Sequence, residues 1–213
     1  MLWRKVESKN RKLEQERAEA ELKNLKSQLN PHFLFNTLNN IYALIAIDHD
    51  RAQKAVLELS RLLRYVLYEN KERFVPIEQE INFLQDYIEV MRLRQNRQTR
   101  IDVNIDISQC TNCRIAPLLF IPLIENAFKH GIDTMQKSFI EIEINSPSDG
   151  TICCRVRNSY FPKNGEDHSG SGIGLDNIRR QLDLLYPQKY HFETTCIDNV
   201  FCATLSINLH KTT

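Results

Sequence analysis

Three short stretches of the sequence hold residue types that phosphate chemistry uses. They read LNPHFLFN at 29–36, PLIENAFKHG at 122–131 and GSGIGLDNIR at 170–179. The third contains three of the chain's six glycines and leads into a predicted helix over 174–186. Small residues before a helix allow backbone N–H groups and the helix N-terminus to approach an anion, which suits phosphate binding. The alternative for this stretch is a flexible surface loop.

The second stretch places oxygen ligands beside cations. Glu125 and Asn126 lie near the end of a predicted helix, and Lys129 and His130 follow within one turn. Because Mg²⁺ prefers oxygen ligands that it shares with phosphates, this mixture suits a magnesium ion bound to a polyphosphate. A polar helix end without a ligand is the alternative.

The first stretch predicts an exposed histidine beside a helix kink. Pro31 interrupts the helical pattern, and His32, Asn36 and Asn39 recur at helical spacing on the side opposite the apolar residues. A neutral imidazole, with an ordinary pKa of about 6.5, offers a nitrogen lone pair near neutral pH. A plain surface histidine is the alternative.

Helical periodicity dominates the first part of the chain. Residues 1–28 lack Gly and Pro and carry a narrow apolar seam, which predicts a coiled-coil lead-in or, alternatively, a solvated single helix. Two amphipathic helices follow over 33–45 and 52–67, the second capped by Asp48 or Asp50. Two such helices predict an antiparallel hairpin that dimerises into a four-helix bundle.

The pattern changes after a third helix that begins near Pro76. Residues 117–130 also look helical, and strands are predicted at 100–107, 138–145, 151–157, 190–197 and 200–208. We therefore expect an α+β chain with helices on one face of a sheet. Two domains are expected. Residues 1–72 form a helical dimerisation region, and residues 73–213 form the α+β region.

Composition excludes several classes of protein. Among 213 residues, 28 basic and 27 acidic side chains leave a net charge of +1, so no nucleic-acid footprint is expected. The longest apolar run, 115–124, is broken by two prolines, and no signal peptide opens the chain, so neither secretion nor a membrane span is expected. Of six cysteines, Cys110 and Cys113 have the one metal-like spacing; reduced thiols are the favoured interpretation and a structural zinc the alternative.

Together the three stretches resemble the sensor histidine kinases of the LytS/YehU type, in the family's order and over residues 22–210. NPHFLFN resembles the phosphoacceptor block, ENAFKHG the N box of the ATP-binding domain, and GSGIGLDNIRRQL the glycine-rich lid with its following helix. The resemblance implies an α/β-sandwich ATP-binding domain of the gyrase/chaperone/kinase/MutL type on a mixed sheet. It also implies a homodimer, a response regulator partner and a membrane-spanning sensor segment upstream of a cytoplasmic kinase.

The resemblance further implies Mg-ATP as substrate and His32 as the residue that accepts the γ-phosphoryl group, which then passes to an aspartate of the regulator. Asn126 is the implied Mg²⁺ ligand, and Glu125 the residue that positions or activates. The implied nucleotide-binding set comprises Asn126, Lys129, His130, Asn158, Gly170, Gly172, Gly174, Leu175, Asn177 and Arg179.

Some residues depart from the family pattern. Phe33 follows the phosphoacceptor where many histidine kinases have an acid, so Asn36 is the candidate for orienting the imidazole. Asn158 stands where the wider family has an adenine-reading aspartate, and its alternative is a strand-end residue that caps a turn. A degenerate nucleotide-binding scaffold without kinase activity, or an ATPase that gates dimer contacts, are the alternative functions.

Overall fold

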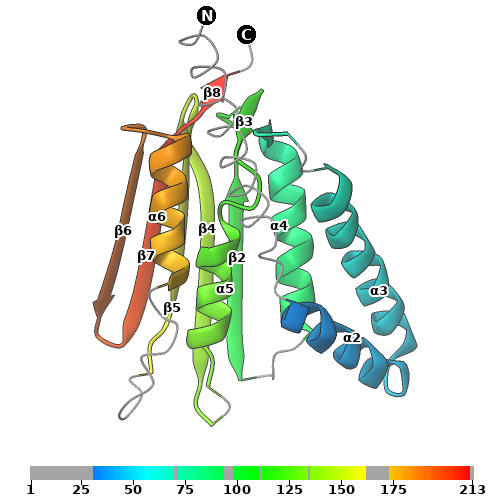
Figure 1. Ribbon diagram of the computed structural model, residues 1–213. Coiled ribbons are helices and arrows are strands. Elements are labelled where there is room, and N and C mark those ends of the chain that lie inside the picture. Colours follow the sequence, from blue (N-terminus) through cyan, green and yellow to red (C-terminus); the bar gives the residue numbers. More distant parts are fainter. Residues whose placement is uncertain are drawn as a thin grey trace, which may run out of the picture. The chain divides into compact units, whose positions relative to one another are not determined.

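The computed structural model describes residues 31–69, 72–93, 98–110, 112–133, 135–161 and 173–211. The predicted lead-in helix over 1–28 and the residues that precede the Pro31 kink lie outside this range. Internal contacts divide the chain into two compact units, Met1–Gln53 and Lys54–Thr213. Figure 1 shows the helices and strands of both units, coloured along the sequence.

The first unit contains helix α2 (Pro31–Ile45) and the first turn of α3 (His49–Arg64). Asp48 caps α3, as predicted, because its Oδ1 accepts the backbone N–H of Arg51 at 3.0 Å. Of the predicted apolar face of α2, Phe33 and Ile41 are buried, whereas other members such as Leu38 remain exposed. The predicted hairpin and four-helix bundle stay predictions.

The second unit is built on a five-stranded mixed sheet in the order β2-β4-β5-β7-β6. The strands are β2 (Thr99–Asp106), β4 (Ser138–Ser148), β5 (Thr151–Ser159), β6 (Tyr190–Ile197) and β7 (Val200–Asn208). Strand β2 runs parallel to β4, and the other neighbouring pairs are antiparallel. Gly150, at φ 77°, makes the predicted turn between β4 and β5 possible.

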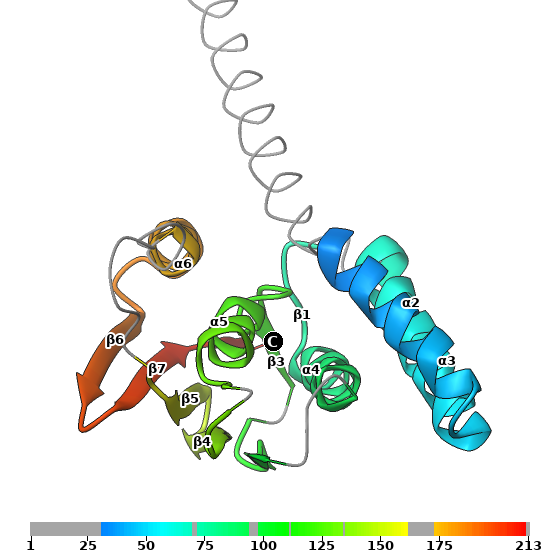
Figure 2. The ribbon, with the colours of Figure 1, turned by 90° about the horizontal axis from the view of Figure 1, so that it is seen from below.

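The two faces of this sheet differ in chemistry. Every second residue of β4 from Ser138 to Ser146 is buried, on the side where α5 (Ile121–His130) and α6 (Ile173–Leu185) lie. Figure 2 shows both helices on the same side of the strands. The opposite face carries ion pairs, such as Arg157 with Glu141 at 2.6 Å and Arg155 with Glu143 at 3.4 Å. The predicted α+β layer with helices on one face is confirmed.

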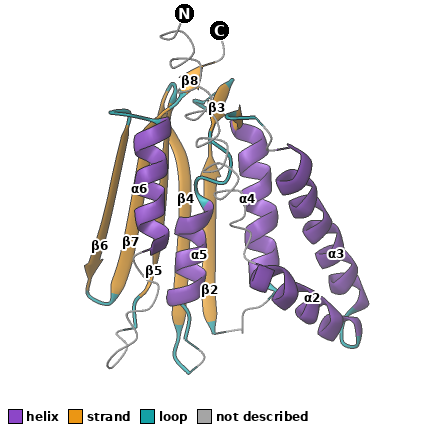
Figure 3. Ribbon diagram, in the orientation of Figure 1, coloured by secondary structure: helices purple, strands orange, loops and turns teal. Residues whose placement is uncertain are grey.

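Helix α4 (Ile77–Arg92) packs against a second, small sheet. That sheet has the order β1-β3-β8, formed by β1 (Val75–Pro76), β3 (Cys113–Ile115) and β8 (His210–Lys211). Figure 3 labels β3 and β8 of this sheet. Pro76 precedes α4 and supplies a backbone already suited to a helix start, as predicted.

The end of α3 belongs to the second unit. A π-helical turn, η1 (Tyr65–Glu69), continues α3, and Arg61 donates two hydrogen bonds to Asp86 of α4 at 2.7 and 2.8 Å. The division between the two compact units thus falls inside α3. The predicted domains, 1–72 and 73–213, stay predictions.

One predicted helix is shorter than expected. The helix predicted over 117–130 begins at Ile121, and residues 117–120 form turns in which Leu118 has φ 63°. Had the helix begun at 117, Pro122 would lie in its interior and its ring would clash with the carbonyl of Leu118. In the first turn of α5, by contrast, Pro122 lacks only an N–H that would have no partner there.

Candidate functional site

Helix α5 presents its polar residues along one edge. Its buried residues pack toward β4 and β5, and they are Ile121, Leu123, Ile124, Ala127 and Phe128. Glu125, Asn126 and His130 are half-buried, and Lys129 is exposed. Because residues four apart share a helix face, Glu125 lies one turn from Lys129 and Asn126 one turn from His130. The edge therefore combines a carboxylate, an amide oxygen and two groups that can carry positive charge.

The electrostatics of this edge reflect partial burial. Burial raises the pKa of Glu125, and the neighbouring Lys129 opposes that shift. Lys129 and His130 occupy the last turn, where cations also interact favourably with the helix dipole. Helix α5 ends at Gly131, whose N–H donates to the carbonyl of Ala127 at 2.8 Å.

A buried amide lies against this helix end. Asn158, near the end of β5, is 1% exposed, and its Nδ2 donates to the carbonyl of Ser159 at 2.7 Å. Its Oδ1 is buried and has no hydrogen-bond partner within the described part of the chain. A Cβ on Gly131 would lie 2.6 Å from the Cβ of Asn158, so only glycine fits there. The junction of α5 and β5 thus holds a buried acceptor that bonds to no donor among the described residues.

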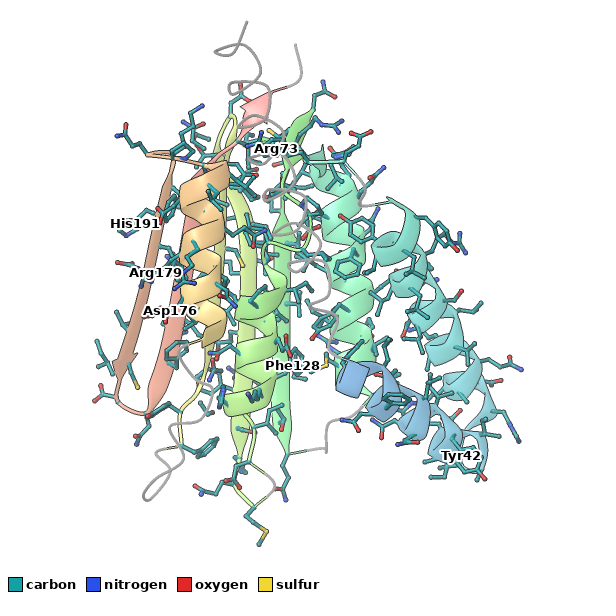
Figure 4. All side chains as sticks on the ribbon, in the orientation of Figure 1. Tyr42, Arg73, Phe128, Asp176, Arg179 and His191 are labelled. Carbon is teal, nitrogen blue, oxygen red and sulfur yellow. The ribbon has the colours of Figure 1, made fainter. Side chains whose placement is uncertain are left out.

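Helix α6 contacts α5 on the same face of the sheet. Gly174 is exposed, and a Cβ there would meet no atom within 4 Å, while Leu175 and Asn177 are half-buried. The guanidinium of Arg179 lies 4.9 Å from the ring centroid of Phe192, on the side of α6 toward β6 (Figure 4). Arg179 therefore makes a cation–π contact with the sheet, a role that the sequence motif did not predict.

Four other predicted residues lie in the first unit or outside the described residues. Gly170 and Gly172 lie outside the described residues. His32 and Asn36 belong to α2 in the first unit; Asn36 is half-buried, and the side chain of His32 is not among those described. The structure thus gathers the predicted residues of α5, β5 and α6 in one unit and leaves the predicted phosphoacceptor in the other.

Two features escaped the sequence analysis. The contact of Gly131 with Asn158 is one, and its only sequence signal is a glycine directly after a helix. The other is Glu80, which is fully buried in α4. Its signal was available, because Glu80 falls three residues after Ile77 and four before Leu84 on the predicted apolar face.

The site fits a magnesium nucleotide. The unpartnered Oδ1 of Asn158 can accept the amino group of a purine, and an oxygen ligand at Asn126 can share a cation with phosphates. No cluster of three or more His, Cys, Asp or Glu side chains in the described ranges could hold a metal by itself. Cys110 and Cys113 are buried free thiols, and burial together with Cys113 raises the pKa of Cys110 to about 12.

Comparison with known proteins identifies relatives among sensor kinases. The sequence model of the family described as histidine kinase matches residues 20–99. The sensor histidine kinase YpdA of Escherichia coli is 34% identical over 181 residues, which cover 81% of this chain and 32% of that protein. The sensor protein LytS of Oceanobacillus iheyensis is 29% identical over 192 residues, covering 83% of this chain and 33% of that protein. The chain thus spans about a third of the length of these relatives.

Solved structures give a more distant likeness. The histidine kinase domain of the blue-light-activated histidine kinase of Erythrobacter litoralis EL346 is 12% identical, with a TM-score of 0.47; the match covers 84% of this chain and 96% of that one. Among the helices that the structure describes, none has the length and apolar character needed to cross a membrane.

Proposed function

Because the chain belongs to the LytS-type sensor histidine kinases, we propose that it is the ATP-dependent kinase portion of a two-component sensor. In this proposal residues 73–213, within the unit Lys54–Thr213, form an ATP-binding domain of the gyrase/chaperone/kinase/MutL type. The mixed sheet with helices on one face supports that assignment. The observation that carries it furthest is the buried Oδ1 of Asn158, which has no partner in the described chain and lies beside the end of α5.

The proposed nucleotide contacts follow from the chemistry of each side chain. Asn158 accepts a hydrogen bond from the adenine amino group through Oδ1, since its Nδ2 is already bonded to Ser159. Asn126 ligates Mg²⁺, which neutralises phosphate charge when bound. Lys129 and His130 contact phosphates from the last turn of α5. Backbone amides near Gly170, Gly172 and Gly174, together with Leu175, Asn177 and Arg179, complete the proposed site.

The proposed reaction transfers a phosphoryl group to an imidazole. A neutral ring nitrogen of His32 attacks the γ-phosphorus, the bond from that phosphorus to its bridging oxygen breaks, and ADP leaves. Asn36, one helical turn along α2, orients the ring, and Glu125 positions the reacting groups. The phosphoryl group then moves from His32 to an aspartate carboxylate of a response regulator.

The proposed assembly is a homodimer formed through α2 and α3. Large exposed side chains support it, among them Phe35, Tyr42 and Leu57 at 67%, 80% and 61% exposure. Since the relatives are about three times as long, we further propose that this is the cytoplasmic portion of a sensor whose membrane-spanning segment lies upstream. No nucleic-acid partner is proposed, because the net charge is +1.

Radiolabelled Mg-ATP tests the proposal. We expect acid-labile, base-stable phosphate on the wild-type chain, loss of that label in His32→Gln, and its retention in His49→Gln. His49 is a suitable control because it is an exposed histidine at the start of α3. Label retained in His32→Gln would contradict the phosphoacceptor assignment. Nucleotide binding without any phosphoprotein would favour the scaffold alternative instead.

A further inference from the structure

A single buried carboxylate joins two elements that are distant in sequence. Glu80 of α4 is fully buried, and its Oε2 accepts the hydroxyl of Tyr65 at 2.7 Å and the backbone N–H of Leu118 at 3.0 Å. Its Oε1 has no partner within the described residues. Burying a carboxylate among apolar side chains costs free energy, so packing does not explain this residue.

One of these elements is the turn that leads into α5. Leu118 has φ 63°, a left-handed backbone conformation that is strained for a branched side chain. Two buried side chains hold the turn, since Glu80 accepts from Leu118 and the hydroxyl of Tyr186 accepts the N–H of Ala116 at 2.7 Å. Tyr186 directly follows α6, so the turn is tied to both helices of the nucleotide site.

The other element is the end of α3. Tyr65 begins the π-helical turn η1, and its ring stacks on Phe83 of α4 with centroids 4.5 Å apart. π-Helical turns are rare and frequently occur at functional sites. The stacked ring holds the hydroxyl of Tyr65 beside Glu80, so a displacement of α3 along α4 would break that hydrogen bond.

We propose that Glu80 is a positioning residue that couples the end of α3 to the start of α5 through its Oε2 atom. The inference rests on the proposed function, because the consequence of the coupling is a change in the rate of phosphoryl transfer. A conformational change in α3 alters the hydrogen bonding of Glu80, and the turn at Leu118 conveys that change to the helix that carries Asn126. The state with the hydrogen bond from Tyr65 to Glu80 and the state without it then differ in specific contacts, as energetic coupling requires.

Hydrogen exchange on the full chain tests the link without any nucleotide. Pro117 and Pro122 have no amide hydrogen, so a peptide covering 116–122 reports on few amides. Glu80→Met keeps the side-chain length but removes the acceptor, and we expect exchange in this peptide to quicken roughly ten-fold. Glu80→Gln retains an acceptor oxygen and should exchange like the wild type. Wild-type exchange in Glu80→Met would overturn the proposal.

Autophosphorylation kinetics separate coupling from mere support of the turn. Tyr65→Phe keeps the stacked ring and the bond from Leu118, and we expect kcat to fall roughly ten-fold with KM for ATP unchanged. Tyr190→Phe is the matched control, because it removes an exposed hydroxyl that bonds to Asp183 at an equal 2.7 Å. Wild-type kcat in Tyr65→Phe would overturn the coupling. A wild-type chain that forms no phosphohistidine would contradict the proposed function, and the exchange comparison would then decide the link alone.

Discussion

Exchanging one amide for a carboxylate tests how the purine is recognised. In Asn158→Asp, a charged acceptor replaces the neutral Oδ1 that the structure leaves without a partner in the described chain. A hydrogen bond to a charged group contributes ~1.5–3 kcal/mol, against ~0.5–1.5 kcal/mol for a neutral pair. The difference of about 1 kcal/mol corresponds to several-fold tighter binding of ATP.

The same change has an opposite effect on stability. Nδ2 of Asn158 donates to the carbonyl of Ser159 at 2.7 Å, and an ionised aspartate cannot make that bond. Two oxygens would face each other in a site that is 1% exposed. We therefore expect the free energy of unfolding to fall by about 1–3 kcal/mol while nucleotide affinity rises.

Calorimetric titration with non-hydrolysable ATP and GTP analogues measures the affinities, and urea unfolding measures the stability. Asn145→Asp is the matched control, because its Nδ2 donates to Glu143 on the charged face of the sheet at 3.1 Å. This control should lose stability without any change in affinity. Equal or weaker ATP affinity in Asn158→Asp, or an equal gain for the GTP analogue, would refute recognition of adenine by residue 158.

Three further predictions concern Asn126, Tyr42 and Glu80. Asn126→Ala should abolish Mg-ATP turnover without unfolding the chain, which circular dichroism checks, and undiminished autophosphorylation would exclude its role as a metal ligand. Tyr42→Asp places a charge at a position 80% exposed on α2 and should weaken the dimer roughly ten-fold in sedimentation; an unchanged dimer fraction would locate the interface elsewhere. Burial raises the pKa of Glu80 from 4.5 to about 7, so its contribution to stability is fully present below pH 4.5 and is lost as pH rises through 7. In urea unfolding, the stability of wild type relative to Glu80→Gln should therefore fall by up to about 3 kcal/mol from pH 4.5 to 8, and a constant difference would contradict the raised pKa.

Local patterns in the sequence determined most of the secondary structure. The alternation of Ile140, Ile142 and Ile144 predicted both strand β4 and its buried face, because side chains of a strand alternate between faces whatever surrounds it. Pro76 and Asp48 likewise fixed helix starts through their own backbone and side-chain chemistry. The residue blocks around Asn126 and Asn158 identified the candidate site before its geometry was known.

Contacts between distant segments were decided only by the tertiary structure. The sheet order β2-β4-β5-β7-β6 brings the end of β5 against the end of α5, so Gly131 meets Asn158 across 27 positions of sequence. The cation–π contact of Arg179 with Phe192 likewise joins separate elements, and so do the hydrogen bonds that Glu80 accepts from Tyr65 and Leu118. Periodicity describes how a segment divides between solvent and core, but it does not state which other segment supplies the core. For that reason the sequence placed Glu80 on an apolar helix face, but only the tertiary structure identified Tyr65 and Leu118 as its hydrogen-bond partners.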